Sequence, residues 1–416
     1  MTPPTATLRG TGALSGPARL TPVNRAPLAG PVPASGAWRP GDPVGGRRFH
    51  DLPGPLPLAS GQVLPGARIA YETFGTLAPD GSNAVLVLHA LTGDSHVAGP
   101  AGPGHPSPGW WERLLRPGAA LDPARWFVVA PNAIGGCQGS TGPSSTDPEA
   151  SDGRRWGSRF PRLAMTDLVS AELGLLDHLG IASWAAVVGG SMGGMRALQW
   201  AVDAPDRVQR LFLLASPAFT DADSIGSITT QVLAVTGDPN WRGGDYFDAP
   251  DGAGPHAGLG LARRIAHLTY RSPGELAERF GRVPQAGEDP AAGGRYAVQS
   301  YLDHHADKLT RRFDAASYVV LSRTMLDFDI GTRFGGGPDG RARALASVTA
   351  ATEVAGIDSD RLFPLAEQAV LADGIPGARG LRVVTSEFGH DGFLIEAPQV
   401  DELLAGLLAR QPAHAR

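Results

Sequence analysis

The stretch AAVVGGSMGGMRAL, residues 185–198, decides the fold. A short apolar run ends in a glycine pair, meets Ser191, passes a second glycine pair and continues in residues that favour a helix. Gly189-x-Ser191-x-Gly193 matches the nucleophile elbow, in which a strand turns sharply into a helix with the serine at its apex. Small residues flank the serine because larger side chains would clash in so tight a turn. The pattern therefore predicts a strand, a turn that holds the Ser191 hydroxyl above a sheet, and a helix.

The helix that follows Ser191 begins with N–H groups that have no partner inside the helix. Such groups bind negative charge, so the N–H of Met192 can face an oxyanion that develops beside the serine. G-x-S-x-G is a short pattern, and a glycine-rich turn with an incidental serine would share it. The apolar run before the turn and the helical residues after it favour the nucleophile interpretation.

Short apolar runs around this stretch predict the rest of the sheet. Continuous apolar runs are typical of strands buried on both faces, and they cover residues 84–88 and 126–130. Residues 211–214 and 381–386 are predicted as further strands. Helical patterns separate the runs, including residues 166–179 with Thr166 as a possible N-cap. Residues 62–74 alternate loosely, as an edge strand would. This order predicts an α/β fold with a mostly parallel central sheet covered by helices on both faces.

The alternation of strands and helices is interrupted once. Between residues 219 and 340 the strand runs stop and long mixed stretches look helical, so we expect an inserted helical lid there. The α/β-hydrolase core then comprises residues 49–218 and 341–416. Residues 1–48 are rich in Pro, Gly, Ala, Thr and Ser, and we expect them to form a disordered tail.

Composition excludes several classes of partner. The chain has 416 residues, 42% of them hydrophobic, and a formal net charge of −5, so nothing in its charge favours nucleic acid. No apolar run approaches the about 20 residues that cross a bilayer, so we expect no membrane partner. The single cysteine excludes an internal disulfide and cysteine-rich zinc sites, and it suits the cytoplasm, a reducing compartment.

A nucleophilic serine needs a base and an acid, which in this fold follow it in the order acid, histidine. His390 lies in a glycine-flanked loop directly after the last predicted strand, so we interpret it as the base. Asp358 and Asp360 both follow the preceding apolar run, and spacing alone leaves both open as the acid. Asp391 adjoins the base in sequence, and adjacent side chains tend to point apart, so we expect it to contact substrate instead.

Two other sets of potentially reactive residues are weaker candidates for a functional site. Asp94, His96 and His105 are close in sequence, but their spacing matches no common ligand pattern, so we expect no metal site. Cys137 has no recognisable base, and we interpret it as a packed loop residue.

Six motifs together resemble the homoserine O-acetyltransferase family. They occur in order along residues 49–408: HALTGDSH at 89–96, GGCQGSTGP at 135–143, WGSRFP at 156–161, GGSMGG at 189–194, DRLFP at 360–364 and GHDGFL at 389–394. The resemblance implies an α/β-hydrolase core with a deep tunnel to the serine, and a helical lid that forms a homodimer. It also implies a Ser191–His390–Asp360 triad, and so favours Asp360 over Asp358. The backbone N–H groups of Leu91 and Met192 would form the oxyanion hole.

The predicted lid contains GLGLARRIAHLTYR at 258–271, which is similar to the family's substrate-binding segment. The resemblance implies that Arg263 and Tyr270 contact the amino-acid substrate and that Asp391 binds its ammonium group. An amino-acid acceptor needs a fixed cation for its carboxylate and a fixed anion for its amine, which agrees with these residue types. Arg264 adjoins Arg263, so the sequence leaves the choice between the two arginines open.

The activity implied by the resemblance is acetyl transfer from acetyl-CoA to the hydroxyl of L-homoserine, a step of methionine biosynthesis, with no bound cofactor. Fold and triad alone do not choose the acceptor. Homoserine O-succinyltransferase, serine O-acetyltransferase and carboxylester hydrolase activities therefore remain alternatives. A non-catalytic binding protein of the same fold is disfavoured by the complete set of triad residues.

Overall fold

A central eight-stranded sheet organises the chain in the computed structural model, which describes residues 30–411. The strand order is β1-β4-β6-β5-β7-β8-β9-β10. The strands are β1 (Arg48–Asp51), β4 (Arg68–Phe74), β5 (Ala84–Leu88), β6 (Phe127–Pro131), β7 (Ala186–Gly190), β8 (Arg210–Leu214), β9 (Ala351–Ile357) and β10 (Ala378–Val384). The β1–β4 and β4–β6 pairs are antiparallel, and all pairs from β6 to β10 are parallel. β2 (Leu56–Pro57) and β3 (Val63–Leu64) form a separate hairpin.

Helices cover both faces of this sheet, as the buried strand runs require. Along β7, Val187 belongs to one buried apolar cluster and Val188 to the other, because successive strand residues point to opposite faces. The first cluster includes residues of α1 (Met165–His178), α2 (Met192–Asp203) and α9 (Leu365–Gly374), and the second includes α11 (Ala397–Leu408). The predicted α/β fold is confirmed.

Two local predictions are wrong. Residues 62–74 do not form an edge strand, because β1 pairs with β4 on one side and β6 pairs with it on the other. Thr166 is not a helix cap, because α1 begins at Met165 and Ala164 is its N-cap. The Asp167 carboxylate accepts from the Ala164 N–H at 2.8 Å, and the Thr166 hydroxyl instead donates to Asp203.

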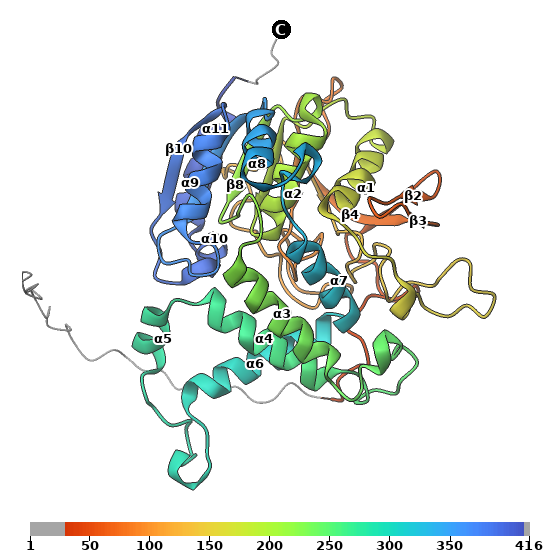
Figure 1. Ribbon diagram of the computed structural model, residues 1–416, viewed down its shortest axis with the longest axis vertical. Coiled ribbons are helices and arrows are strands. Elements are labelled where there is room, and N and C mark those ends of the chain that lie inside the picture. The colour runs from red at the N-terminus through yellow and green to blue at the C-terminus, as the bar shows by residue number, and fades with distance from the viewer. Residues whose placement is uncertain (1–29, 412–416) are drawn as a thin grey trace, which may run out of the picture.

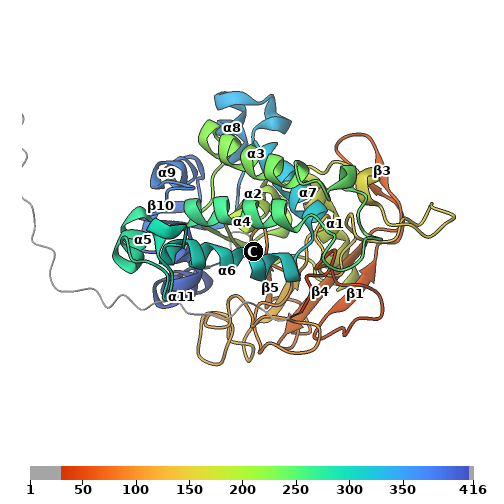
Figure 2. The same cartoon turned by 90° about the horizontal axis from the view of Figure 1, so that it is seen from below.

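Five helices between β8 and residue 326 lie over one end of the core. They are α3 (Ala222–Thr236), α4 (His256–Tyr270), α5 (Pro273–Phe280), α6 (Ala297–Arg312) and α7 (Ala315–Leu326), and α8 (Gly337–Ala346) follows before β9. In Figure 1 α3 to α6 lie below the sheet, and the view from below in Figure 2 shows α4 and α6 in front of it. These helices occupy the stretch in which we expected a lid.

The first described residues pack between this lid and the core. We call residues 30–40 the N-terminal strap. The Ser35 hydroxyl donates to the Asp314 carboxylate at 2.7 Å, and the Trp38 N–H donates to the Cys137 carbonyl at 2.9 Å. Ser35 is 6% exposed. The expectation of disorder up to residue 48 is therefore wrong for residues 30–48, whereas residues 1–29 lie outside the described part.

Within residues 30–411, the structure contains no helix that combines the length and the apolar character of a membrane span.

Candidate active site

Ser191 lies at the turn between β7 and α2 with φ 58° and ψ −128°, a conformation that side-chain-bearing residues rarely adopt. Such a strained residue persists only where its surroundings fix it, and it typically marks a functional site. A Cβ on Gly189 would collide with the Gly193 carbonyl, and a Cβ on Gly193 would collide with the Leu88 carbonyl. The glycines that flank the serine are therefore required by close backbone approach, as the sequence pattern predicted.

His390 connects the serine to a buried acid. Its Nε2 lies 2.8 Å from Ser191 Oγ, and its Nδ1 lies 2.6 Å from Asp360 Oδ2. The side chains of His390 and Asp360 are 3% and 0% exposed. His390 reaches this place from η6 (Gly389–Asp391), which follows the last strand. The structure thus brings together the three residues that the sequence proposed as a catalytic set, in the order that nucleophilic catalysis requires.

The two competing acids have different partners. Asp360 uses its second oxygen, Oδ1, to accept from the N–H groups of Leu362 and Phe363 at 2.8 and 3.0 Å, which fixes the carboxylate against the imidazole. Asp358 instead accepts from the Ser386 N–H at 2.9 Å. Asp358 therefore braces the loop after β9, and Asp360 is the residue that orients His390.

The surroundings of His390 change its proton affinity. Burial alone lowers the pKa of the imidazole, but the charge and hydrogen bond of Asp360, together with the charge of Asp391, outweigh burial and raise the pKa above its usual value. Asp360 thereby favours the protonated form of the ring, which a histidine acting as a general base has to adopt.

The two predicted oxyanion donors lie on adjacent segments. Met192 is the first residue of α2, so its N–H precedes the hydrogen-bonded turns of the helix. Leu91 lies in the loop after β5, and in the described part of the chain its N–H donates to no backbone carbonyl. Close approach of Gly193 to the Leu88 carbonyl places the start of α2 against the start of this loop. Neither N–H group donates to a backbone carbonyl in the described part of the chain, as oxyanion donors require.

The lid supplies a cation and an aromatic ring. Arg263 Cζ lies 5.6 Å from the centroid of the Tyr270 ring, whose centroid is 5.8 Å from that of His390. Arg263 Nε is buried and finds no hydrogen-bond acceptor among the described residues. Arg264 forms an ion pair with Asp303 at 2.8 Å on the neighbouring helix α6. Of the two adjacent arginines, Arg263 is the one that packs on Tyr270, the ring beside His390.

Asp391 has a partner that the sequence interpretation missed. Arg271 Nε lies 3.2 Å from Asp391 Oδ2, and Arg271 also approaches Glu275. Burial raises the pKa of Asp391, while the charges of Arg271, Arg263 and His390 oppose this rise. Arg271 directly follows Tyr270 in the lid segment, so its proximity in sequence was the available signal.

A second cluster of titratable groups lies beside the loop after β5. Ligand atoms of Glu72, His96 and His105 lie within 4.8 Å of one another, and all three residues are buried. The sequence had grouped the histidines with Asp94 instead. The two imidazole rings are stacked with centroids 3.8 Å apart and planes at 9°, so one ion cannot lie in both ring planes. Their arrangement as found is therefore better suited to hydrogen bonding than to metal coordination.

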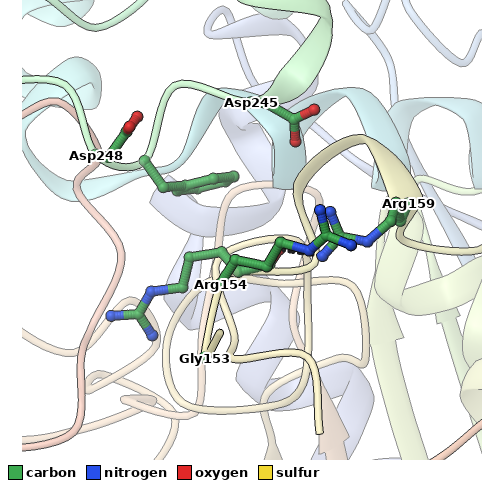
Figure 3. A pocket seen from close by; sticks show the side chains of 7 residues that line it. Gly153, Arg154, Arg159, Asp245 and Asp248 are labelled. Carbon is green, nitrogen blue, oxygen red and sulfur yellow. Dashed lines mark hydrogen bonds between the residues drawn. The ribbon is translucent and has the colours of Figure 1, made fainter. Parts of the chain in front are cut away.

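Cys137 and one surface pocket do not belong to the candidate active site. Cys137 is buried, and burial raises the pKa of its thiol, which makes it unreactive. A surface pocket of about 440 Å³ is lined by residues from 153–159 and 245–248, and Figure 3 shows Arg154 and Arg159 on one side of it and Asp245 and Asp248 on the other. Three arginines and two aspartates line it, and none of its lining residues belongs to the set around Ser191.

Comparison with known proteins agrees with this geometry. Residues 83–397 match the family model described as alpha/beta hydrolase fold. The chain is therefore an α/β-hydrolase-fold protein with a Ser–His–Asp arrangement at the nucleophile elbow. It is 63% identical to homoserine O-acetyltransferase of Thermobifida fusca over 91% of this chain and 98% of the relative. The chain belongs to the homoserine O-acetyltransferase family.

Solved structures of two functional classes share the fold. Homoserine O-acetyltransferase from Bacillus anthracis superposes with a TM-score of 0.78 at 24% identity, covering 88% of this chain and 98% of the other. An acetylester hydrolase from Corynebacterium glutamicum gives a TM-score of 0.75 at 28% identity, covering 88% and 97%. The fold is thus compatible with both transfer and hydrolysis, and the substrate contacts must decide between them.

Proposed function

We propose that this chain transfers an acetyl group from acetyl-CoA to the hydroxyl of L-homoserine through an acyl-Ser191 intermediate. The observation that carries the proposal is the continuous hydrogen-bonded path from Ser191 Oγ through His390 to Asp360. Membership of the family supports the choice of donor and acceptor.

In the first half-reaction His390 Nε2 takes the Ser191 proton while Oγ attacks the thioester carbonyl carbon. The negative charge that develops on the carbonyl oxygen is stabilised by the N–H groups of Leu91 and Met192. The C–S bond then breaks, and His390 returns the proton to the leaving sulfur, so that CoA departs as the thiol. In the second half-reaction His390 takes the hydroxyl proton of homoserine, whose oxygen attacks the acyl carbon. The bond between the acyl carbon and Ser191 Oγ then breaks, and His390 returns the proton to Oγ as O-acetylhomoserine leaves.

We propose that the lid residues select an amino acid as acceptor. Arg263 binds the carboxylate of homoserine, Tyr270 lines the path to His390, and Asp391 binds the ammonium group. The unpartnered Nε of Arg263 supports the first role. Asp391 already lies beside Arg271, which holds its carboxylate in place while the ammonium group approaches.

Water is the competing acceptor, and the lid must exclude it from the acyl-enzyme. Ser191 is only 6% exposed, which supports this role of the lid. A carboxylester hydrolase would instead turn over acyl-enzyme with water alone. Serine as acceptor and succinyl-CoA as donor are the nearest alternatives within the transferase class.

One assay separates these activities. CoA release is measured from acetyl-CoA and from succinyl-CoA, each with homoserine, serine or no acceptor. We expect rapid release only with acetyl-CoA and homoserine, and none from Ser191→Ala with any pair. Full turnover by Ser191→Ala would overturn the mechanism, and acceptor-independent release would identify a hydrolase.

We further propose that the chain forms a homodimer through the lid and works in the cytoplasm, where its donor acetyl-CoA is available. Large apolar side chains on α3 and α4 are unusually exposed: Ile225 by 43%, Leu233 by 63%, Leu261 by 48% and Leu268 by 44%. Exposed apolar side chains that gather on neighbouring helices are typical of protein–protein interfaces.

A further inference from the structure

Glu72 is a buried carboxylate on a strand of the central sheet, and the mechanism above does not use it. It lies on β4 and is 3% exposed. The carboxylate accepts from the Ser95 hydroxyl at 2.8 Å and contacts His96 Nδ1 at 3.2 Å. Both partners belong to the loop after β5, which also carries Leu91. A buried carboxylate is costly unless it is hydrogen-bonded, so its position indicates that the two loop residues are its intended partners.

His96 and His105, whose rings are stacked, help to fix the loop after β5. His105 Nε2 accepts from the Gly46 N–H at 3.1 Å, so its proton lies on Nδ1 and the ring is neutral. Burial lowers the pKa of His105. Burial also disfavours a charge on His96, but the hydrogen bond and charge of Glu72 outweigh burial and raise its pKa. His96 is therefore bound to the carboxylate through Nδ1 and stacked on the His105 ring, whose Nε2 also lies 3.6 Å from Glu72 Oε1.

Other contacts hold the same loop at its remaining positions. Arg312 of the lid donates to the Thr92 carbonyl at 2.9 Å, and Trp110 Nε1 donates to the Asp94 carbonyl at 3.0 Å. Together with Glu72, these contacts fix residues 92–96 on several sides. An oxyanion donor must be held within about 0.5 Å of its productive position, yet loops are the most mobile parts of a fold. The position of the Leu91 N–H therefore depends on the contacts that hold this loop.

We propose that Glu72 is a positioning residue of the oxyanion hole: through Ser95 and His96 it fixes the loop that presents the Leu91 N–H to the reacting carbonyl. This inference rests on the proposed acyl-transfer function. Acylation and deacylation use the same oxyanion hole, so a displaced Leu91 slows both half-reactions by the same factor. Substitution of a residue that binds only the acceptor would slow only the second half-reaction.

The experiment measures single-turnover acylation by acetyl-CoA and deacylation by homoserine, each per active site counted by an ester burst. Counting sites removes the effect of any unfolded fraction. We expect Glu72→Ala and Ser95→Ala to slow both steps equally, by about 10- to 100-fold, a part of the loss seen when an oxyanion donor is removed outright. Glu72→Gln should recover most of the rate, because its amide can accept from Ser95 and donate to His96 in its other tautomer.

Glu353→Gln is the matched control. Glu353 is also a buried strand glutamate, but it pairs with Arg410 at 3.2 Å on β9, away from this loop. We expect it to leave both rates unchanged. Unchanged rates in Glu72→Ala, a loss confined to one step, or no recovery in Glu72→Gln would overturn the inference. If Ser191→Ala stays active, the proposed function itself is wrong, which separates the two failures.

Discussion

At the scale of single residues, the position of one proton decides whether Ser191 can react. Asp360 accepts two backbone N–H groups on one oxygen and faces His390 with the other, so the imidazole is oriented with Nδ1 toward the acid. The Nε2 lone pair is then directed at the serine hydroxyl only while the ring is neutral. Acid therefore inactivates this arrangement by protonating His390.

The first prediction concerns pH. Because Asp360 raises the pKa of His390, kcat/KM should fall as the pH drops through a value above the usual 6.5 of histidine. Asp360→Asn removes the charge, so the acid limb should shift to lower pH, and kcat should fall by roughly 10⁴-fold because the imidazole tautomer is wrong. A pH–rate profile of both proteins checks this, and an unshifted limb would contradict the assignment of Asp360.

The second prediction concerns acceptor binding. Arg263→Ala should lower kcat/KM for homoserine by about 10- to 100-fold, the value of a hydrogen-bonded ion pair. Acylation by acetyl-CoA should be unaffected, because homoserine binds only after the acyl-enzyme has formed. Arg264→Ala is the control, since Arg264 pairs with Asp303 instead. Equal effects of the two substitutions would remove Arg263 from the site.

At the scale of elements, the end of α4 and the loop that carries His390 are fitted to each other. Gly389 has φ +65°, and a Cβ there would lie 2.6 Å from the Tyr270 carbonyl oxygen and 2.7 Å from the Ser272 nitrogen. The Ser272 hydroxyl also donates to the Glu387 carbonyl. The lid therefore contacts the loop that carries His390 through its backbone at Gly389 and through the Ser272 hydroxyl at Glu387.

The third prediction tests this contact. Gly389→Ala should destabilise the fold by about 1–3 kcal/mol through its strained backbone and should also lower kcat, because relief of the clash moves His390. Gly274→Ala is the control: Gly274 lies at the start of α5, and its nearest neighbour would be 3.8 Å from a new Cβ. Thermal unfolding and steady-state kinetics measure both effects. A neutral Gly389→Ala would show that the two segments move independently.

The strands and the triad could be predicted because their signals are local. Buried parallel strands are continuous apolar runs, and β5 matched its predicted range, whereas β10 begins three residues before the prediction. The choice between Asp358 and Asp360 depended on which carboxylate reaches His390, a contact across two loops. Glu72 gave no signal because its partners lie 23 and 24 positions away in sequence and nothing about an isolated glutamate indicates burial. The N-terminal strap was wrongly predicted to be disordered, because its Pro- and Gly-rich composition gives no sign of its contacts with the lid.

At the scale of the whole molecule, the exposed apolar side chains of α3 and α4 are the surface through which we propose that the chain dimerises. Our fourth prediction is that Leu233→Glu converts the proposed dimer to a monomer, because a charge cannot be buried in an apolar interface without a partner. Val63→Glu is the control, since Val63 is similarly exposed, at 56%, but lies on β3 outside the lid. Light scattering after size exclusion measures the mass. A dimeric Leu233→Glu protein would place the interface elsewhere.

Ser35 and Asp314, which are in contact, are 279 positions apart in the chain. This separation determines when the contact can form during synthesis. The amino-terminal residues leave the ribosome first, yet the residues that receive them are translated much later, and His390 later still. Domains tend to fold as their residues emerge. A nascent chain can therefore join the N-terminal strap to the lid before the segment that carries His390 has been translated.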